Sequence, residues 1–449
     1  MDMKKLFGTD GMRAVAGEYP LDRMTIYILG RALVGLLREE GLPPEVLVGR
    51  DTRESGEWIE AELVRGVSDA GGAFHSAGII PTSGVSHLTR FHAFSAGAVI
   101  SASHNPYRDN GIKIFSSKGM KISDAWEARL EKGIFAQAGM LTPPADERPP
   151  AAESRLIDDY EKFLVDRFES VRLPRRFKIV LDCGQGASSR IAPDVFRAIG
   201  AEPVALNAAP DGRNINAGCG SLHPEGMARA VVREGADFGV SLDGDADRAL
   251  WSDENGRLLN GDHTLHILAR FLAGRGLLKA GAVVATTMSN MGLEKALGDV
   301  GLRLVRTQVG DKYVLEKMIE LGANLGGERS GHTILLDDCP TGDGILTGLK
   351  ILETMAWTGK SLSALAEGYS EFPQILLNVR VARKIALAEI PSIAAAIEDV
   401  RARLAGRGRL DVRYSGTEPL LRIMVEGQDQ TEIDGHARRI AAAASALLG

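Results

Sequence analysis

The chain has 449 residues and a net charge of −6, and at about 100–200 residues per domain this length predicts three or four domains. The negative charge argues against a nucleic-acid-binding protein with a large basic face, and no apolar run is long enough to span a membrane. Cys183, Cys219 and Cys339 are scattered and form neither a disulfide framework nor a zinc motif, and no signal-peptide core follows the N-terminus. We therefore expect a cytoplasmic protein.

Short apolar runs that alternate with helical patterns predict three sets of βα units. The first set places a strand at residues 45–51 and a helix in residues 55–72, which end in two glycines. The same rhythm returns over residues 177–207 and again over residues 282–307. In the second set, residues 181–189 lack the third glycine of a dinucleotide-binding loop and are interpreted as a structural βα turn. Three α/β domains are the natural interpretation.

The C-terminal part of the chain has a different rhythm. Residues 375–383 are strand-like, residues 389–404 are helical, residues 410–427 form two strands around a loop, and residues 431–449 are helical. This order predicts a small α+β domain.

Three segments separate the predicted domains. Residues 137–154 are rich in proline and alanine, residues 253–257 form a polar turn, and residues 367–374 precede the change of rhythm. The predicted domains are 1–154, 155–254, 255–368 and 369–449.

Three aspartates, Asp243, Asp245 and Asp247, follow the apolar run 238–242 at alternate positions. The residues between them are small, so the backbone can bring the carboxylates together, where they repel one another unless a cation compensates. A hard divalent ion bound by oxygen atoms meets this need. An EF-hand is excluded because Arg248 stands where that loop needs glycine. We favour a metal site over a solvated acidic turn.

A second polar cluster follows the apolar run 97–100. Ser103 is followed by His104, a potential hydrogen-bond partner, and by an Asn-Pro turn. We expect Ser103 at the C-terminal edge of a parallel sheet, where α/β proteins place ligands, and it is either a turn residue or a nucleophile. The sequence lacks the G-x-S-x-G elbow of an α/β-hydrolase. Lys113, on the next strand-like run, points either to solvent or into a cleft.

Two further loops carry groups that suit a sugar phosphate. Glu328, Ser330 and His332 lie among glycines, which permit close approach of a ligand, and the histidine titrates near neutrality. The other loop can bind phosphate through arginine and backbone amides, although it also fits a plain hairpin turn. No Walker A motif is present, so a nucleoside triphosphate is not implied. The candidate phosphate ligands are Arg413, Ser415, Gly416, Thr417 and Arg422.

Taken together and in this order, the motifs resemble the α-D-phosphohexomutase superfamily, and most of all its bacterial glucosamine-phosphate branch. The resemblance implies three related α/β domains and a smaller C-terminal α+β domain around a central active-site cleft. It covers essentially the whole chain, through FGTDGMRAVAG, ISASHNPYRDNGIKIF, DGDADR, MSNMGL, VGDKYVLEKM, GGERSGH and RYSGTEPLLR.

The resemblance implies that Ser103 carries a phosphate and donates it to a sugar. A Mg²⁺ ion, bound by the three aspartates and a phosphoserine oxygen, would offset the charge of the phosphate. The implied reaction converts glucosamine 6-phosphate to glucosamine 1-phosphate for UDP-N-acetylglucosamine synthesis. It proceeds through a bisphosphorylated sugar, which also serves as activator.

The resemblance also assigns roles to the remaining candidates. Arg13, Lys113 and His332 match positions near the transfer site, with a general acid/base among them, while His104 and Arg248 support the phosphoserine and metal region. Glu328 and Ser330 match sugar-contacting positions, and the loop 413–422 matches the phosphate-binding loop.

Two alternatives stay open at this point. A phosphomannomutase or phosphoglucomutase has the same fold, so the preference for an amino sugar is less secure than the reaction type. A non-catalytic sugar-phosphate sensor should have lost the phosphorylatable serine or the metal aspartates, and both are intact here. The expected partner is a small sugar phosphate, with no nucleic acid and no membrane, and the family suggests a homodimer.

Overall fold

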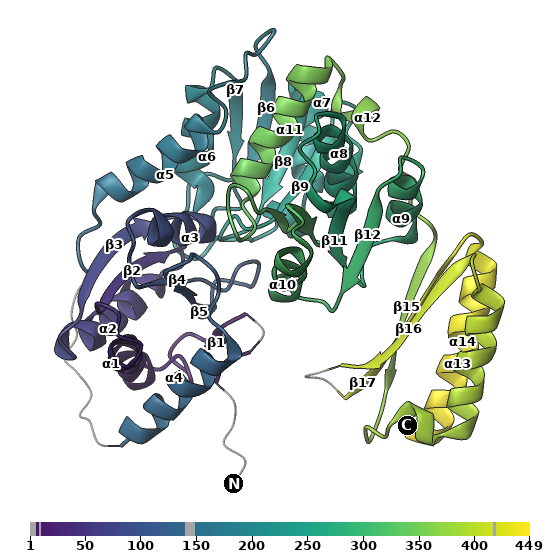
Figure 1. Ribbon diagram of the computed structural model, residues 1–449, viewed down its shortest axis with the longest axis horizontal. Coiled ribbons are helices and arrows are strands. Elements are labelled where there is room, and N and C mark those ends of the chain that lie inside the picture. Colours follow the sequence, from purple (N-terminus) through teal and green to yellow (C-terminus); the bar gives the residue numbers. More distant parts are fainter. Residues whose placement is uncertain (1–5, 9, 140–148, 416–418) are drawn as a thin grey trace. The chain divides into compact units, whose positions relative to one another are not determined.

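The computed structural model describes residues 6–8, 10–139, 149–415 and 419–449 (Figure 1). The chain divides into two compact units. The larger unit comprises Met1–Met288 and Leu304–Glu367, and the smaller unit comprises Ser289–Arg303 and Gly368–Gly449. None of the helices in the described ranges combines the length and the hydropathy that a membrane crossing requires.

The first sheet of the larger unit has the strand order β1-β5-β4-β2-β3. Strand β2 pairs parallel with β3 and β4, whereas β5 runs antiparallel to β4 and β1. The expectation of a parallel sheet beside Ser103 is therefore wrong in part, because residues 101–108 are too few for the crossover that a parallel neighbour needs. The strands are β1 (Met12–Val15), β2 (Glu45–Arg50), β3 (Ala73–Ile79), β4 (Ala96–Ile100) and β5 (Asp109–Ser116).

Helices cover both faces of this first sheet. Side chains of α1, α2 and α4 join those of β2, β4 and β5 in one apolar core. Helix α3 packs on the other face, where a Cβ at Gly49 or Gly97 would meet the Val85 side chain at 2.5 or 3.0 Å. The helices are α1 (Arg23–Glu39), α2 (Gly56–Asp69), α3 (Thr82–Phe91) and α4 (Asp124–Gln137). The predicted strand at 45–51 and the helix within 55–72 are confirmed.

The second sheet repeats this plan with the order β10-β9-β8-β6-β7. Strand β6 pairs parallel with β7 and β8, and β9 returns antiparallel to β8. The strands are β6 (Lys178–Asp182), β7 (Glu202–Leu206), β8 (Phe238–Leu242), β9 (Ala249–Asp253) and β10 (Leu258–Leu259). The helices are α5 (Ser154–Asp166), α6 (Ser188–Ala198), the short η1 (Gly220–Leu222) and α7 (Glu225–Glu234).

The third sheet follows the same plan again, with the order β12-β11-β13-β14. Strand β13 pairs parallel with β11, and β14 returns antiparallel to β13. The strands are β11 (Ala282–Thr286), β12 (Arg303–Thr307), β13 (Leu325–Gly327) and β14 (Thr333–Leu335). The helices of this part are α8 (Gly261–Gly274), η2 (Lys279–Gly281), α10 (Asp311–Leu321), α11 (Gly344–Thr358) and α12 (Leu362–Leu365).

The three sheets share one local design. In each, a central strand is followed by a short loop and an antiparallel strand: β4 to β5, β8 to β9, and β13 to β14. The loop after each central strand holds one of the predicted motifs, namely the Ser103 loop, the aspartate loop and the loop 328–332. The expectation of three related α/β parts is confirmed by this topology.

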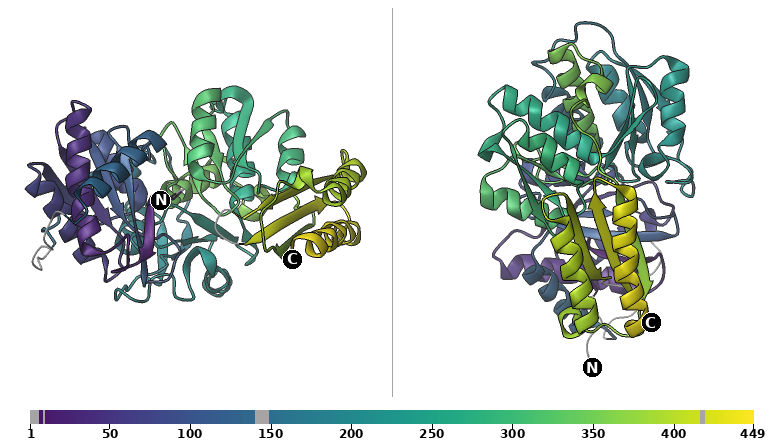
Figure 2. Two further views of the ribbon diagram at one scale, coloured as in Figure 1. Left: turned by 90° about the horizontal axis from the view of Figure 1, so that it is seen from below. Right: turned by 90° about the vertical axis from the view of Figure 1, so that its right-hand side faces the viewer.

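The smaller unit holds a three-stranded antiparallel sheet with helices on one face (Figure 2). Apolar side chains of α13 and α14 pack against β15 and β17. The elements are α9 (Met291–Gly298), β15 (Gln374–Arg380), η3 (Leu387–Glu389), α13 (Pro391–Leu404), β16 (Gly408–Tyr414), β17 (Leu420–Gly427) and α14 (Gln430–Leu448). The predicted α+β pattern is confirmed.

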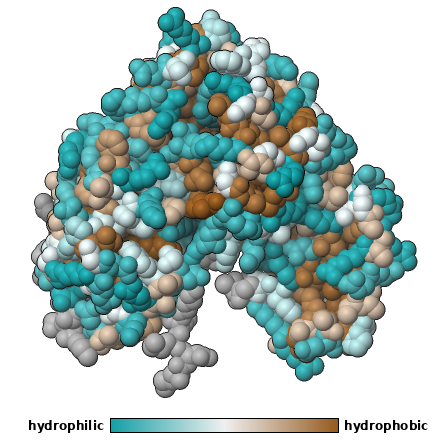
Figure 3. All heavy atoms as spheres, viewed as in Figure 1, coloured by the Kyte–Doolittle hydropathy of each residue, from teal (hydrophilic) through white to brown (hydrophobic). Residues whose placement is uncertain are grey.

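Burial of these cores leaves mainly hydrophilic side chains on the face drawn in Figure 3, with smaller apolar areas between them. The predicted boundary at residue 254 falls in the β9–β10 turn, where the Asp253 amide donates to the Arg257 carbonyl (3.0 Å). The division into four domains at the predicted residues stays a prediction.

Helices α1 and α2 can approach closely because Gly30 of α1 has no side chain. A second glycine of the same helix, Gly35, provides a control for a stability test. A Cβ at Gly30 would lie 2.2 Å from the Leu63 carbonyl oxygen, whereas a Cβ at Gly35 of the same helix meets nothing within 4 Å. We expect Gly30→Ala to destabilise the protein by about 1–3 kcal/mol through overpacking. Gly35→Ala should stabilise it by about 0.5–1 kcal/mol through helix propensity. Urea unfolding of both variants checks this, and equal effects would contradict the close packing.

Candidate active site

The larger unit brings two of the predicted loops into direct contact. The carboxylates of Asp243, Asp245 and Asp247 are buried, and one oxygen of each lies within 4.8 Å of the others. Ala246, at φ 57°, closes the tight turn that gathers them, and its amide donates to the Asp243 carbonyl (3.0 Å). The prediction that small intervening residues let the three carboxylates converge is confirmed.

Electrostatic strain in this cluster is large. Burial raises the pKa of Asp243 well above its usual range, and the neighbouring Asp247 and Asp245 raise it further. Burial alone would also raise the pKa of Asp247, but Lys113 and His332 outweigh it and hold that pKa well below its usual range. The positive neighbours therefore stabilise the ionised form of Asp247, whereas they do not offset the burial and repulsion that disfavour the ionised form of Asp243.

Lys113 is the principal counter-ion of the cluster. Its Nζ lies 2.9 Å from Asp245 Oδ2, 3.2 Å from Asp247 Oδ2 and 3.4 Å from Asp10 Oδ2, and its side chain is 1% exposed. Of the two directions left open by the sequence, it takes the one into the interior. Burial lowers the pKa of Lys113, but the three carboxylates outweigh this and hold the pKa well above its usual value. In this arrangement Lys113 is a protonated cation and not a base.

The aspartate oxygens fit a bound divalent cation. Asp245 Oδ1 and Asp247 Oδ1 are buried, and neither accepts a hydrogen bond from a residue in the described ranges. A buried carboxylate oxygen without a partner is costly, and a hard cation is the partner that such oxygens satisfy. The second oxygen of Asp245 accepts from the Thr82 hydroxyl at 2.7 Å, which fixes the orientation of the carboxylate. This buried triad is able to bind a metal.

Ser103 stands directly against the aspartate cluster. Its hydroxyl donates to Asp243 Oδ2 at 2.6 Å and lies 3.2 Å from His104 Nδ1. The backbone of Ser103 is left-handed, with φ 51°, a conformation that only a few per cent of non-glycine residues adopt. The residue is 1% exposed. Ser103 is therefore a buried and specifically oriented hydroxyl and not a simple surface turn.

His104 and Arg248 complete the surroundings of this hydroxyl. Arg248 Nη1 donates to His104 Nδ1 at 2.9 Å, and the Arg248 amide donates to Asp243 Oδ1 at 3.1 Å. Burial, together with the charges of Arg248 and Arg13, lowers the pKa of His104 to about 4. His104 is thus neutral near pH 7, with Nδ1 as an acceptor. The guanidinium is positioned beside the hydroxyl, where a phosphate would need a cation.

His332 reaches the same cluster from the β13–β14 loop. Its Nδ1 lies 3.8 Å from Asp247 Oδ1 and its Nε2 lies 3.6 Å from Asp311 Oδ2. Burial lowers the pKa of His332, but Asp247, Asp311 and Glu328 outweigh it and raise that pKa. The Gly342 amide donates to Nε2 at 2.9 Å, which favours the tautomer with the proton on Nδ1.

The same loop presents the two predicted sugar ligands. Glu328 Oε1 accepts from the Gly310 amide at 3.1 Å, so the carboxylate is anchored at the start of the VGDKYV segment. Ser330 is exposed at the tip of the loop. A Cβ at Gly261 would lie 2.0 Å from the Glu328 carbonyl oxygen, so the first turn of α8 supports the loop from behind.

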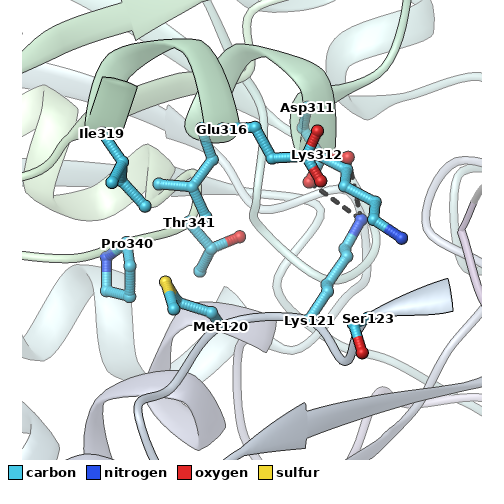
Figure 4. A pocket seen from close by; sticks show the side chains of 10 residues that line it. Met120, Lys121, Ser123, Asp311, Lys312, Glu316, Ile319, Pro340 and Thr341 are labelled. Atoms are coloured by element: carbon cyan, nitrogen blue, oxygen red, sulfur yellow. Dashed lines mark hydrogen bonds and ion pairs between the residues drawn. The ribbon is translucent and has the colours of Figure 1, made fainter. Parts of the chain in front are cut away.

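An ion network that the sequence did not reveal continues from this site. Asp10 contacts Arg13 and Lys121, and Lys121 also pairs with Asp311 at 2.8 Å. Figure 4 shows Lys121 reaching Asp311 beside a cavity of about 200 Å³. Apolar side chains of the β5–α4 loop, α10 and residue 340 also line this cavity, namely Met120, Leu315, Ile319 and Pro340. Asp10 and Asp311 lie within quoted motifs, but nothing in the sequence marks Lys121.

The predicted phosphate loop lies in the smaller unit. Arg413 and Arg422 are directly paired across β16 and β17, and Arg413 Nη1 lies 3.1 Å from Asp411 Oδ2. The Ser415 amide donates to the Leu420 carbonyl at 2.8 Å. The antiparallel pairing of β16 with β17 agrees with the hairpin interpretation, and the phosphate-binding role of the segment stays a prediction. Gly416 and Thr417 lie outside the described residues. Lys384 Nζ donates to the Ser415 carbonyl at 2.5 Å, and no signal in the sequence singled it out.

Four models of one protein family match the chain in order. They are the phosphoglucomutase/phosphomannomutase alpha/beta/alpha domains I (residues 4–139), II (158–256) and III (260–372), and the C-terminal domain (376–443). The three alpha/beta/alpha models agree with the sheet plan that the structure repeats three times. The chain belongs to the phosphoglucomutase/phosphomannomutase family.

Within this family, the chain is similar over its whole length to proteins named phosphoglucosamine mutase. The phosphoglucosamine mutase of Koribacter versatilis is 48% identical, covering 100% of this chain and 98% of that protein. The phosphoglucosamine mutase of Geotalea daltonii is 47% identical, covering 98% and 97%.

Solved structures share the fold. A phosphoglucomutase/phosphomannomutase family protein from Burkholderia thailandensis has a TM-score of 0.80 at 23% identity, covering 99% of this chain and 98% of that chain. The N-acetylphosphoglucosamine mutase of Aspergillus fumigatus, in complex with GlcNAc-6P and magnesium, has a TM-score of 0.68 at 19% identity, covering 98% and 95%.

Removal of one carboxylate tests the metal site. We expect Asp245→Asn to weaken Mn²⁺ binding by more than about tenfold, since even the outer partners of metal ligands contribute 10–100-fold. Asp311→Asn is the matched control, because Asp311 belongs to the ion network but not to the triad. Its Mn²⁺ affinity should stay close to that of the wild type. Isothermal titration measures both, and unchanged affinity in Asp245→Asn would exclude the triad as the site.

Proposed function

We propose that this protein interconverts glucosamine 6-phosphate and glucosamine 1-phosphate, with Ser103 as the phosphoryl carrier. The observation that carries the proposal is the buried Ser103 hydroxyl held 2.6 Å from one of three clustered aspartates. A serine hydroxyl does not need three carboxylates beside it in order to be buried, so the arrangement points to a functional role. The names of relatives at 45–48% identity over the whole chain support the amino-sugar substrate.

Mg²⁺ is the ion we propose for the aspartate triad. Mg²⁺ prefers hard oxygen ligands such as these carboxylates, and it is the ion that usually accompanies phosphate groups in proteins. When bound, it would offset the negative charge of the phosphate on Ser103. The triad itself is positioned by Thr82, Lys113 and the amide of Arg248. None of these contacts involves the Ser103 hydroxyl.

The proposed reaction consists of two transfers with the sugar turned round between them. In the first, the bond between phosphorus and Ser103 Oγ breaks and a bond to the sugar O1 forms, while the O1 proton passes to a base and Ser103 Oγ takes up a proton. The resulting bisphosphate reorients. In the second, the phosphoryl group on O6 returns to Ser103 Oγ, which gives up its proton to a base, O6 regains a proton, and glucosamine 1-phosphate leaves. A bisphosphorylated sugar from solution would load an unphosphorylated Ser103 in the same way.

The side chains around Ser103 supply the remaining roles. We assign Arg248 and His104 to the transferring phosphoryl group, because they already meet beside the Ser103 hydroxyl. Arg13, Lys113 and His332 are the candidates for proton transfer, and Lys113, as a protonated cation in this arrangement, is a candidate for donating a proton and not for accepting one. Of the three, His332 is the only imidazole, so it needs the smaller change to act near neutrality, and the proton it offers is the one on Nδ1, because its Nε2 accepts from the Gly342 amide.

Two groups would hold the rest of the substrate. Glu328 and Ser330 suit the sugar hydroxyls, since the carboxylate is anchored and the hydroxyl is exposed. Arg413 and Arg422 form a cross-strand pair that suits the phosphate not being transferred, together with the 415–417 segment. The cytoplasmic location and the homodimer suggested by the resemblance stay predictions.

A substrate panel tests the reaction. With Mg²⁺ and glucose 1,6-bisphosphate as primer, we expect turnover of glucosamine 6-phosphate to exceed that of mannose 1-phosphate and glucose 1-phosphate. A coupled assay of each substrate gives kcat/KM. A higher kcat/KM for a hexose would instead identify a phosphomannomutase or phosphoglucomutase of the same fold. Absence of turnover with every substrate would favour a sugar-phosphate sensor.

Removal of the carrier hydroxyl tests the role of Ser103. Ser103→Ala should lose at least about 10³-fold in kcat, because the variant lacks the proposed carrier oxygen. The matched control is Ser116→Ala at the end of β5, whose hydroxyl donates to the Met120 carbonyl (3.1 Å), and it should keep near wild-type turnover. Intact-mass measurement after incubation with the bisphosphate should show added phosphate on the control and none on Ser103→Ala. Near wild-type turnover of Ser103→Ala would remove Ser103 from its role.

A further inference from the structure

We propose that the buried Arg53–Asp51 ion pair is a positioning device that holds Ser103 in its left-handed conformation and aims its hydroxyl at the aspartate triad. The inference rests on the proposed role of Ser103 as phosphoryl carrier. Among the described residues, no hydrogen bond or ion pair joins Arg53 or Asp51 to the triad or to the Ser103 hydroxyl, and their hydrogen bonds to the Ser103 loop reach the backbone of Ser103. Neither residue was singled out by the sequence.

The guanidinium of Arg53 collects the carbonyl groups of the Ser103 loop. Its Nη2 donates to the carbonyls of Ser103 (2.8 Å) and Asn105 (2.9 Å), and its Nη1 donates to that of Pro106 (2.6 Å). The side chain of Arg53 is completely buried. A completely buried cation that gives three hydrogen bonds to one loop fixes the path of that loop, because the guanidinium would lose its acceptors if those carbonyls moved away.

Asp51 holds the same loop from the other side. Its Oδ2 accepts from Arg53 Nε at 2.9 Å and from the Ser101 hydroxyl at 2.7 Å. The Ser101 hydroxyl in turn accepts the amide proton of Ser103 at 2.9 Å. The amide and the carbonyl of Ser103 are thus both tied to one ion pair, the first through Ser101 and the second through Arg53.

This double attachment accounts for the backbone of Ser103. A left-handed conformation costs a non-glycine residue about 1–2 kcal/mol, so the surroundings must hold it. Glycine would adopt it freely but has no hydroxyl to offer. Asn216 adds a further donor to the Ser103 carbonyl at 2.9 Å, from the loop that follows β7. The left-handed conformation thus falls on the residue whose hydroxyl faces Asp243, and its amide and carbonyl are both held by hydrogen bonds.

Arginine is required here by geometry and not by charge alone. Its planar fork reaches two or more carbonyl groups and the carboxylate of Asp51 at once, whereas a lysine ammonium is a compact donor on a shorter reach. Arg53→Lys keeps the positive charge that balances Asp51, but a lysine cannot make all the hydrogen bonds that the guanidinium donates to the loop. The carrier hydroxyl should then lose its alignment while the remote sugar and phosphate ligands stay as they are.

The experiment compares Arg53→Lys with Arg50→Lys. Arg50 is also a well-buried partner of a carboxylate, Glu60, at 2.9 Å, and its guanidinium pairs with Glu60 and Glu57 instead of the Ser103 loop. For each variant we would measure the melting temperature, the rate at which glucose 1,6-bisphosphate phosphorylates Ser103 by mass spectrometry, and kcat and KM. Arg53→Lys should slow both phosphorylation and kcat by about tenfold or more, with KM little changed. Arg50→Lys should lose stability only.

A milder variant keeps the test decisive if Arg53→Lys does not fold. Ser101→Ala removes the link between Asp51 and the Ser103 amide without exposing a buried charge, and it should also slow Ser103 phosphorylation. Wild-type rates in either folded variant would overturn the positioning role. Wild-type protein that never takes phosphate on Ser103 would instead overturn the proposed function, and this inference with it.

Discussion

Three carboxylates buried within 4.8 Å of one another form the constraint on which the rest of this structure depends. Burial and mutual repulsion raise the pKa of Asp243, while Lys113 holds the pKa of Asp247 down. Such a cluster is unfavourable unless cations balance it. The charges of Arg248 and Lys113 do this in part. Two carboxylate oxygens, which accept no hydrogen bond from the part of the chain that the structure describes, mark where a metal ion would complete the balance.

The same sheet plan recurs three times, so the three loops of the candidate site lie at corresponding positions in their sheets. Each central strand ends in a loop and an antiparallel strand, so the Ser103 loop, the aspartate loop and the loop 328–332 occupy the same topological position in three sheets. Ser103 and Asp243 meet although they are far apart in the sequence, and an isolated bridge joins Arg248 to His332. A chain built this way places the proposed carrier, metal ligands and sugar ligands on loops at equivalent positions of three related sheets.

Much of this arrangement could be predicted from the sequence, because the signals are local. Hydrophobic periodicity marks the strands and helices, and alternate aspartates separated by small residues mark the triad. The burial of Lys113 could not be fixed, since period-two alternation gives its side of the strand but not what covers that side. Lys121 and Arg53 went unnoticed because each acts through partners distant in the sequence, a carboxylate at Asp311 and the carbonyls after β4. The antiparallel direction of β5 was not predicted, because the only sign of it in the sequence is that residues 101–108 are too few for a crossover connection.

The most direct measurement of the central claim is the ³¹P resonance of the phosphorylated protein during titration with Mn²⁺. If a phosphate on Ser103 lies beside a metal held by the aspartates, the paramagnetic ion must broaden that resonance before the metal exceeds the protein, and added Mg²⁺ must restore it. A phosphoserine resonance that stays sharp when Mn²⁺ is demonstrably bound would show that carrier and metal do not share one site, and the account would fail.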